Sequence, residues 1–250
     1  MSNYQRNTNM VVCIFVVLVG GAVITGLLSY YGTANWNWTR ATTEYAFEAE
    51  VGATTGTVTL DIDLNAGGVT LTFVDNATLL YDIDIEVENN TVATDGEPTV
   101  TFASNTIGLD YTAAGVNITL GTGVNYTIDI NAEAGGVSID LDNGAHIGDV
   151  TVQSTAGGIS FKMSDNVILV GSPTFDFEEL AGGISFLIDL PPNVGGSFEC
   201  TAGLGGVDIT AAGWTEVTST HYETSDYDTA PQSLTITAHT SAGGISATLT

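Results

Sequence analysis

Hydrophobic and polar residues alternate with a period of two along most of the chain after residue 45. Such alternation over five or more residues is typical of a strand with one buried face. Each run follows a pair of small residues, as in Ala-Gly-Gly-Ile-Ser at 156–160 and again at 242–246. The apolar positions after these pairs are Val69, Leu71, Phe73, Val116, Ile118, Leu120, Val137, Ile139, Leu141, Ile159, Phe161, Met163, Ile184, Phe186, Ile188, Ile245, Ala247 and Leu249.

The small-residue pair recurs at a nearly fixed interval. Its first members are Gly67, Ala114, Gly135, Gly157, Gly182, Gly205 and Gly243. From residue 114 to residue 205 the steps are 21 to 25 residues. Asn90-Thr91 would divide the long gap before residue 114, because Asn replaces Gly best at positive φ. A period in the twenties is the signature of a solenoid, in which each unit is buried only by stacking on its neighbours.

A second apolar pair lies seven and five residues before the corner, as in Leu60/Ile62 and Phe175/Phe177. Each unit therefore reads as strand, Gly-Gly corner, strand and loop, with glycine where the chain turns and stacks closely. We expect an all-β, single-stranded β-solenoid (β-helix) of about eight rungs over residues 45–250. A β-sandwich is the alternative, but its hairpins need turn signals about every 8–12 residues.

The chain before residue 45 has a different character. Residues 10–28 carry no charge and are long enough to cross a bilayer as a helix. Tyr30, Tyr31, Trp36 and Trp38 follow, as in an interfacial aromatic belt. We expect a cytoplasmic tail (1–9), a transmembrane helix or signal anchor (10–30), a linker (31–44) and an exported domain (45–250). A cleaved signal peptide is the alternative, although its apolar core is usually shorter.

Charge excludes several classes of partner. Three Lys and Arg oppose 29 Asp and Glu, a formal net charge of -26. Such a chain cannot neutralise a phosphate backbone, so nucleic-acid binding is excluded, and anionic headgroups would repel it. The acidity suits a solvating surface or one that gathers cations. The two cysteines, Cys13 and Cys200, lie in unlike segments and predict no disulfide, and Cys200 falls in an inward strand position.

Outward acidic pairs suggest one candidate metal site. The Asp61/Asp63, Asp82/Asp84 and Asp140/Asp142 pairs have a spacing of two, which places both carboxylates on one face of a strand. Stacked carboxylates can hold Ca²⁺, with Asp61, Asp63, Asp140 and Asp142 as the candidate ligands. Solvating charge is the simpler interpretation, and no cofactor is expected.

Five Asn-x-Ser/Thr sequons follow the apolar segment, at Asn37, Asn76, Asn89, Asn117 and Asn125. The alternation places Asn117 and Asn125 outward, and Asn76 falls in a loop. These positions are the candidate glycosylation sites of an exported protein.

The segment 211–232 is longer than a rung needs and contains Trp214, His221, Tyr222 and Tyr227. Aromatic loops on rigid scaffolds often bind ligands, whereas a loop here could instead cap the open end of the stack. Because the terminal strand ends the chain, we expect it to lie at that end. End-to-end self-association is the alternative to an intramolecular cap.

Catalytic patterns are absent from the sequence. No Gly-x-Ser-x-Gly, HExxH or phosphate loop occurs, and Lys162 is the one basic residue of residues 45–250. We therefore expect a protein that is not an enzyme.

The repeated small-Gly-[Val/Ile]-polar-apolar units resemble the β-helix domains of prokaryotic cell-envelope proteins known as putative adhesins, over roughly residues 45–250. The resemblance implies an extracytoplasmic protein with a structural or adhesive role at the cell surface, and the apolar segment 10–30 predicts that it is anchored in the membrane. Its partners would be cell-surface glycans or other envelope proteins. Two alternatives are a filament subunit with a pilin-like N-terminal helix and an envelope-stress sensor domain.

Overall fold

The computed structural model describes residues 41–250, and the expected tail, transmembrane helix and most of the linker lie outside them. Within the described part, no helix is long and apolar enough to span a membrane. This part is all-β, as expected. The elements are β1 (Thr42–Glu50), β2 (Thr57–Phe73), β3 (Leu79–Glu88), α2 (Asn89–Asp95), β4 (Thr101–Ala103), β5 (Thr106–Leu120), β6 (Asn125–Leu141), β7 (His146–Met163), β8 (Ile168–Leu169), β9 (Thr174–Ile188), β10 (Val194–Leu204), β11 (Val207–Ala211), β12 (Trp214–Thr218), β13 (His221–Thr224), β14 (Gln232–Ala242) and β15 (Ile245–Leu249).

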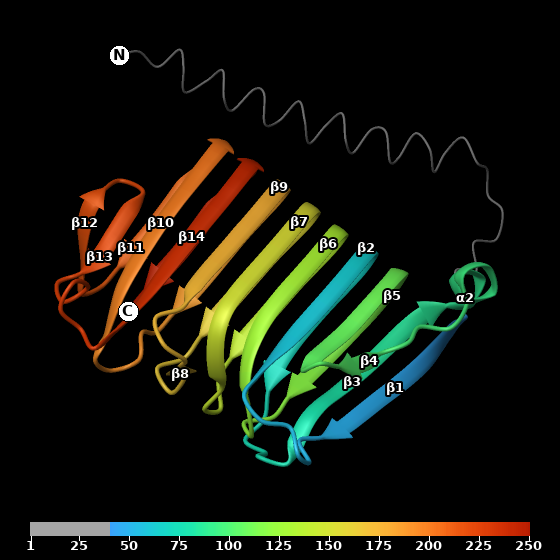
Figure 1. Cartoon of the computed structure of the whole chain (residues 1–250). Coiled ribbons are helices and arrows are strands. Elements are labelled where there is room, and N and C mark those ends of the chain that lie inside the picture. The colour runs from blue at the N-terminus through green and yellow to red at the C-terminus, as the bar shows by residue number, and fades with distance from the viewer. Residues whose placement is uncertain (1–40) are drawn as a thin grey trace, which may run out of the picture. The chain divides into compact units, whose positions relative to one another are not determined.

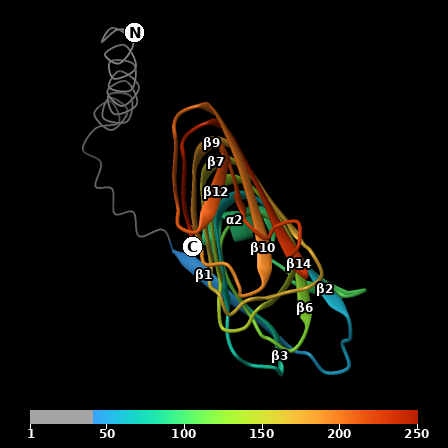
Figure 2. The same cartoon turned by 90° about the vertical axis from the view of Figure 1, so that its left-hand side faces the viewer.

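The long strands bend at the small-residue corners. In a view along the stack, each runs along one side, bends, and returns along the other (Figure 2). Neighbouring bent strands are parallel and in register, so that Gly135 pairs with Gly157 and Gly157 with Gly182. The apolar residues before and after each corner therefore face one shared core. The predicted inward residues after the corners are buried in this core. Tertiary packing of these apolar ladders explains why local sequence alternation becomes a large sheet.

Glycine at the first corner position is required by backbone proximity. A Cβ on Gly157 would lie 1.8 Å from the carbonyl oxygen of Gly135, and one on Gly182 would lie 2.0 Å from that of Gly157. The clash always points to the neighbouring strand on the β5 side. Gly67 is the last glycine in this series and faces the carbonyl of Ala114, on β5. Ala114 is tolerated because β5 is the outermost bent strand on that side.

The order of the stack departs from the order of the chain. The bent strands lie side by side as β5-β2-β6-β7-β9-β14-β10 (Figure 1), and β15 and β11 continue β14 and β10 beyond their corners. The terminal strand β15 therefore pairs with β9 on one side and β11 on the other. The expectation that it forms the end of the stack is wrong. The order of stacking can differ from the order of the chain because each bent strand presents a similar series of apolar residues to its neighbours.

Added strands cover the β5 end. β3 pairs antiparallel with the second half of β5, β1 pairs antiparallel with β3, and β4 pairs with the start of β5. Between β3 and β4, the segment 89–95 forms helix α2, so the prediction of a corner at Asn90-Thr91 is wrong. The helix breaks the strand alternation, and this part of the chain closes the sheet edge instead of adding a rung. Seven corners replace the expected eight rungs.

The β10 end carries the hairpin of β12 and β13. β13 pairs antiparallel with β10 over residues 197–199, and β12 pairs with β13. The indole of Trp214 lies against Gly196, where a Cβ would be 2.3 Å from the ring. Segment 211–232 thus covers the first half of this end. Beyond the corner, β11 pairs only with β15 among the described strands.

Candidate functional site

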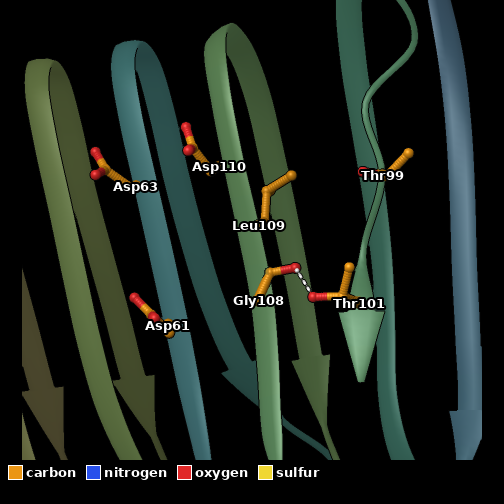
Figure 3. A pocket seen from close by; sticks show the side chains of 7 residues that line it. All are labelled: Asp61, Asp63, Thr99, Thr101, Gly108, Leu109 and Asp110. Carbon is orange, nitrogen blue, oxygen red and sulfur yellow. Dashed lines mark hydrogen bonds between the residues drawn. The ribbon is translucent and has the colours of Figure 1, made fainter. Parts of the chain in front are cut away.

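An acidic groove lies on the outer face near the β5 end. It has a volume of about 320 Å³ and is lined by Asp61, Asp63, Thr99, Thr101, Gly108, Leu109 and Asp110. Figure 3 shows the three carboxylates on neighbouring strands, with the two threonines on the segment opposite. The Thr101 hydroxyl donates a hydrogen bond to the Gly108 carbonyl at 3.4 Å, which holds β4 against β5. The groove therefore presents carboxylate and hydroxyl oxygens.

Strand register produces this concentration of carboxylates. Asp63 pairs with Asp110 across β2 and β5, and Asp61 pairs with Asp129 across β2 and β6. Partial burial, with a further contribution from the Asp61 carboxylate, raises the pKa of Asp129. The Asn131 amide donates to Asp63 Oδ1 at 3.2 Å. The groove is consequently a region of unneutralised negative charge.

The sequence analysis missed Asp110 and Asp129. Asp110 precedes its corner residue, Ala114, by four positions, and Asp63 precedes Gly67 by the same interval. Alignment of the outward positions on the corners places Asp63 and Asp110 at the same point of the repeat, and this was the signal for their meeting. Thr99 and Thr101 carry no such signal, because they lie on the segment that leads into β5 and outside the repeat.

The four predicted calcium ligands do not form one ladder. Asp61 and Asp63 precede the corner, whereas Asp140 and Asp142 follow it on β6 and in the next turn. Both Asp140 oxygens accept from Lys162 Nζ at 3.0 Å. Asp142 accepts from the Asn143 backbone and from the Asn166 amide, and these hydrogen bonds lower its pKa. Within residues 41–250, no group of three His, Cys, Asp or Glu side chains is placed to hold a metal ion.

The sequon asparagines differ in their surroundings. Asn76, Asn89 and Asn117 are exposed, Asn125 is half-buried, and Asn37 lies outside the described residues. Asn76 Oδ1 accepts from the Thr78 backbone and hydroxyl at 3.0 and 2.9 Å, and Asn89 Oδ1 accepts from Thr43. Neither strand asparagine faces the core, so the register expected from alternation is correct at both positions.

The aromatic segment brings one histidine close to a serine and a glutamate. His221 Nε2 lies 3.2 Å from Ser197 Oγ and 3.1 Å from Glu223 Oε1. A hydrolytic triad needs the serine and the acid on different ring nitrogens, so this geometry is not one. Tyr222 and Trp214 pack against the core, and the Tyr227 hydroxyl contacts Thr235 Oγ1 at 2.9 Å. His221, Tyr222 and Trp214 thus join the hairpin to β10 and the core, whereas Tyr227 joins the following loop to β14.

Cys200 occupies the inward position expected for it and is 1% exposed. Burial, with a smaller contribution from the Glu199 carboxylate, raises the pKa of its thiol to about 11. A thiol with so little thiolate at neutral pH is a poor nucleophile. It packs in the core as a small hydrophobic residue.

No family model matches this chain, and no curated protein matches it. Among solved structures, it is similar to a protein named "putative cell adhesion protein" from Clostridium sporogenes. The identity is 16%, the TM-score is 0.66, and the match covers 84% of this chain and all of the other. A "putative adhesin" from Bacteroides fragilis matches at 11% identity and a TM-score of 0.33, over 84% of this chain and 98% of that one. At this identity, the first match shows a shared fold.

Proposed function

We propose that the chain is an exported β-solenoid with a structural or adhesive role at the cell surface. The observation that carries this proposal is the fold match over the full length of a protein named for cell adhesion. The parallel, in-register corners favour a solenoid over a β-sandwich, whose neighbouring strands are mostly joined as antiparallel hairpins. Residues 10–30 would anchor the protein in the membrane, with residues 45–250 outside.

The acidic groove is the proposed contact surface. Carboxylates and hydroxyls in an open depression suit the hydroxyl groups of a neutral glycan or the basic side chains of an envelope protein. Acidic polysaccharides are disfavoured, because nothing in the groove offsets their charge.

Binding to whole cells tests the proposal. Asp61→Asn, Asp63→Asn and Asp110→Asn together should reduce adhesion of expressing cells to their natural surface at least tenfold. The matched control replaces three exposed aspartates elsewhere, Asp75, Asp165 and Asp228, and should adhere like the wild type. External protease should digest the domain on intact cells, and carbonate washing should leave the protein in membranes. Unchanged adhesion in the groove variant would reject the contact surface, and a protease-resistant domain would reject export.

End-to-end assembly is a second candidate function, favoured by one observation. Val207, Ile209 and Ala211 on β11 are half-buried, whereas their partners Ile245, Ala247 and Leu249 are buried. A strand edge with partly exposed apolar residues is a template for another strand. Sedimentation should then show oligomers that grow with concentration, and Ile209→Lys should abolish them. A monomer at all concentrations would reject this candidate.

A further inference from the structure

One buried polar cluster lies beneath the corner of β7, β9 and β14 and takes no part in the acidic groove. Ser154, Glu179 and Thr240 are register partners on these three neighbouring strands. They are 6%, 1% and 0% exposed, in positions where the other rungs place Leu64 or Ala132. Three oxygen-bearing side chains thus replace apolar ones at one level of the core.

Two of these side chains have no hydrogen-bond partner. Neither carboxylate oxygen of Glu179 is paired, and neither is the Ser154 hydroxyl. Lys162 is the one lysine or arginine among the described residues, and it binds Asp140. A buried ionised carboxylate without a partner is strongly unfavourable, and a bound water or ion is one way in which native proteins satisfy such a group. The cluster therefore calls for a ligand that is not a side chain.

The glycine at the corner makes room for the Glu179 side chain itself. A Cβ on Gly182 would come within 2.9 Å of Glu179 Oε1, so the glycine allows the carboxylate to lie against the corner. The Thr240 hydroxyl donates to the Gly182 carbonyl at 3.1 Å, which leaves its own lone pairs free. Ser154 and Glu179 also line a surface depression of about 190 Å³, so the cluster lies close to the surface.

We propose that this cluster, the corner oxygen site, binds one hard metal cation through the Glu179 carboxylate and the Ser154 and Thr240 hydroxyls. Hard cations prefer oxygen ligands of these types. A chain with a net charge of -26 raises the cation concentration around itself. The cation would neutralise the carboxylate and join three rungs at their corners. The site is separate from the groove and does not depend on the adhesive proposal.

Thermal unfolding of the full-length protein in detergent tests the site. NaCl, KCl and CaCl2 are compared with tetramethylammonium chloride at equal ionic strength, because tetramethylammonium screens charge but is too large to enter. At least one metal salt should raise Tm by roughly 3 °C or more over tetramethylammonium. Glu179→Gln should abolish this difference. The matched control Glu133→Gln removes an exposed glutamate of β6 and should retain it.

The Ser154→Ala variant distinguishes a bound cation from an empty cluster by its Tm. It does so even if the Glu179→Gln variant fails to fold. If the hydroxyl binds the cation, Ser154→Ala should reduce the metal-specific rise in Tm. If no cation binds, removing an unpaired buried hydroxyl should raise Tm equally in every salt. Equal Tm in all salts for the wild type, or the same metal-specific rise in the Glu179→Gln and Ser154→Ala variants, would overturn the proposal.

Discussion

The centre of the stack and its two ends are built from the same repeat but follow different rules. At the centre, the bent strands β2, β6, β7 and β9 are neighbours in space and follow one another in the order of the chain. At the ends, β5 lies outside β2, and β14 inserts between β9 and β10. The repeat therefore determines that a segment forms a bent strand, but it does not determine the position of that strand in the stack.

Substitution of a corner glycine should cause the largest loss of stability at the centre of the stack. Gly157→Ala should destabilise the fold by about 4 kcal/mol or more, because its Cβ would lie 1.8 Å from the Gly135 carbonyl oxygen. Its neighbour Gly158 provides the control, since a Cβ there would lie 3.4 Å from the nearest atom. Gly158→Ala should cost less than about 1 kcal/mol. Chemical denaturation measures both, and equal losses would contradict stacking of the first corner residues.

The β10 end should be less sensitive than the centre. Trp214→Ala should cost about 2 kcal/mol, because the half-buried indole covers Gly196 and packs on the core. Val217→Ala on the same strand should be nearly neutral, since that side chain is 52% exposed. Hydrogen exchange should show faster opening of β10 and β13 in the Trp214 variant, with β6 and β7 unchanged. Uniform loss of protection would show that the end and the centre unfold together.

Tyr126 connects the centre to the β5 end and tests how tightly they are coupled. Its hydroxyl donates to the Leu80 carbonyl of β3 at 2.6 Å inside the core. Tyr126→Phe should cost about 1–2 kcal/mol, since the carbonyl would remain buried and unpaired. Tyr111→Phe removes a similar bond to the exposed Gly96 carbonyl, which water can satisfy, and should cost less. A larger loss of stability for Tyr111→Phe than for Tyr126→Phe would contradict this explanation.

The smallest expected effect concerns the charge of Asp129, the register partner of Asp61 beside the acidic groove. Because the folded-state pKa of Asp129 is raised by burial and by Asp61, folding favours the protonated form. Ionised Asp129 therefore destabilises the protein, and this contribution grows as pH rises through the pKa of the unfolded and then the folded state. Asp129→Asn should raise stability at pH 7 by less than about 1 kcal/mol, and salt should reduce the gain. A stabilising effect that persists at pH 2 would have another cause.

Much of the centre could be predicted from the sequence, since alternation of period two fixes which side chains face the core. Phe161, Phe175 and Cys200 are buried as expected. The strand order could not be predicted in the same way, because Ile184 can pair equally well with Ile245 or Val207. One residue, Ala114, does indicate where its strand lies in the stack. Ala114 is the single first corner position with a Cβ, and only the last rung on the β5 side has room for it.

The acidic groove was only partly predictable for a related reason. Asp61 and Asp63 are visible as an outward pair, but their meeting with Asp110 and Asp129 depends on register between strands up to 68 residues apart. The wall formed by Thr99 and Thr101 depends on how the segment after α2 returns to β5. The partners of Glu179 depend likewise on the insertion of β14 beside β9.

Cross-linking of neighbouring strands tests the stacking order most directly. Ser185 on β9 pairs with Ser246 on β15, and Ser246 pairs with Asp208 on β11, all three exposed. In a background of Cys13→Ser and Cys200→Ala, Ser185→Cys with Ser246→Cys should form a disulfide under mild oxidation, because register partners lie within bridging distance. Ser185→Cys with Asp208→Cys should remain reduced. A disulfide between positions 185 and 208, with none between 185 and 246, would show that the rungs stack in chain order and contradict this account.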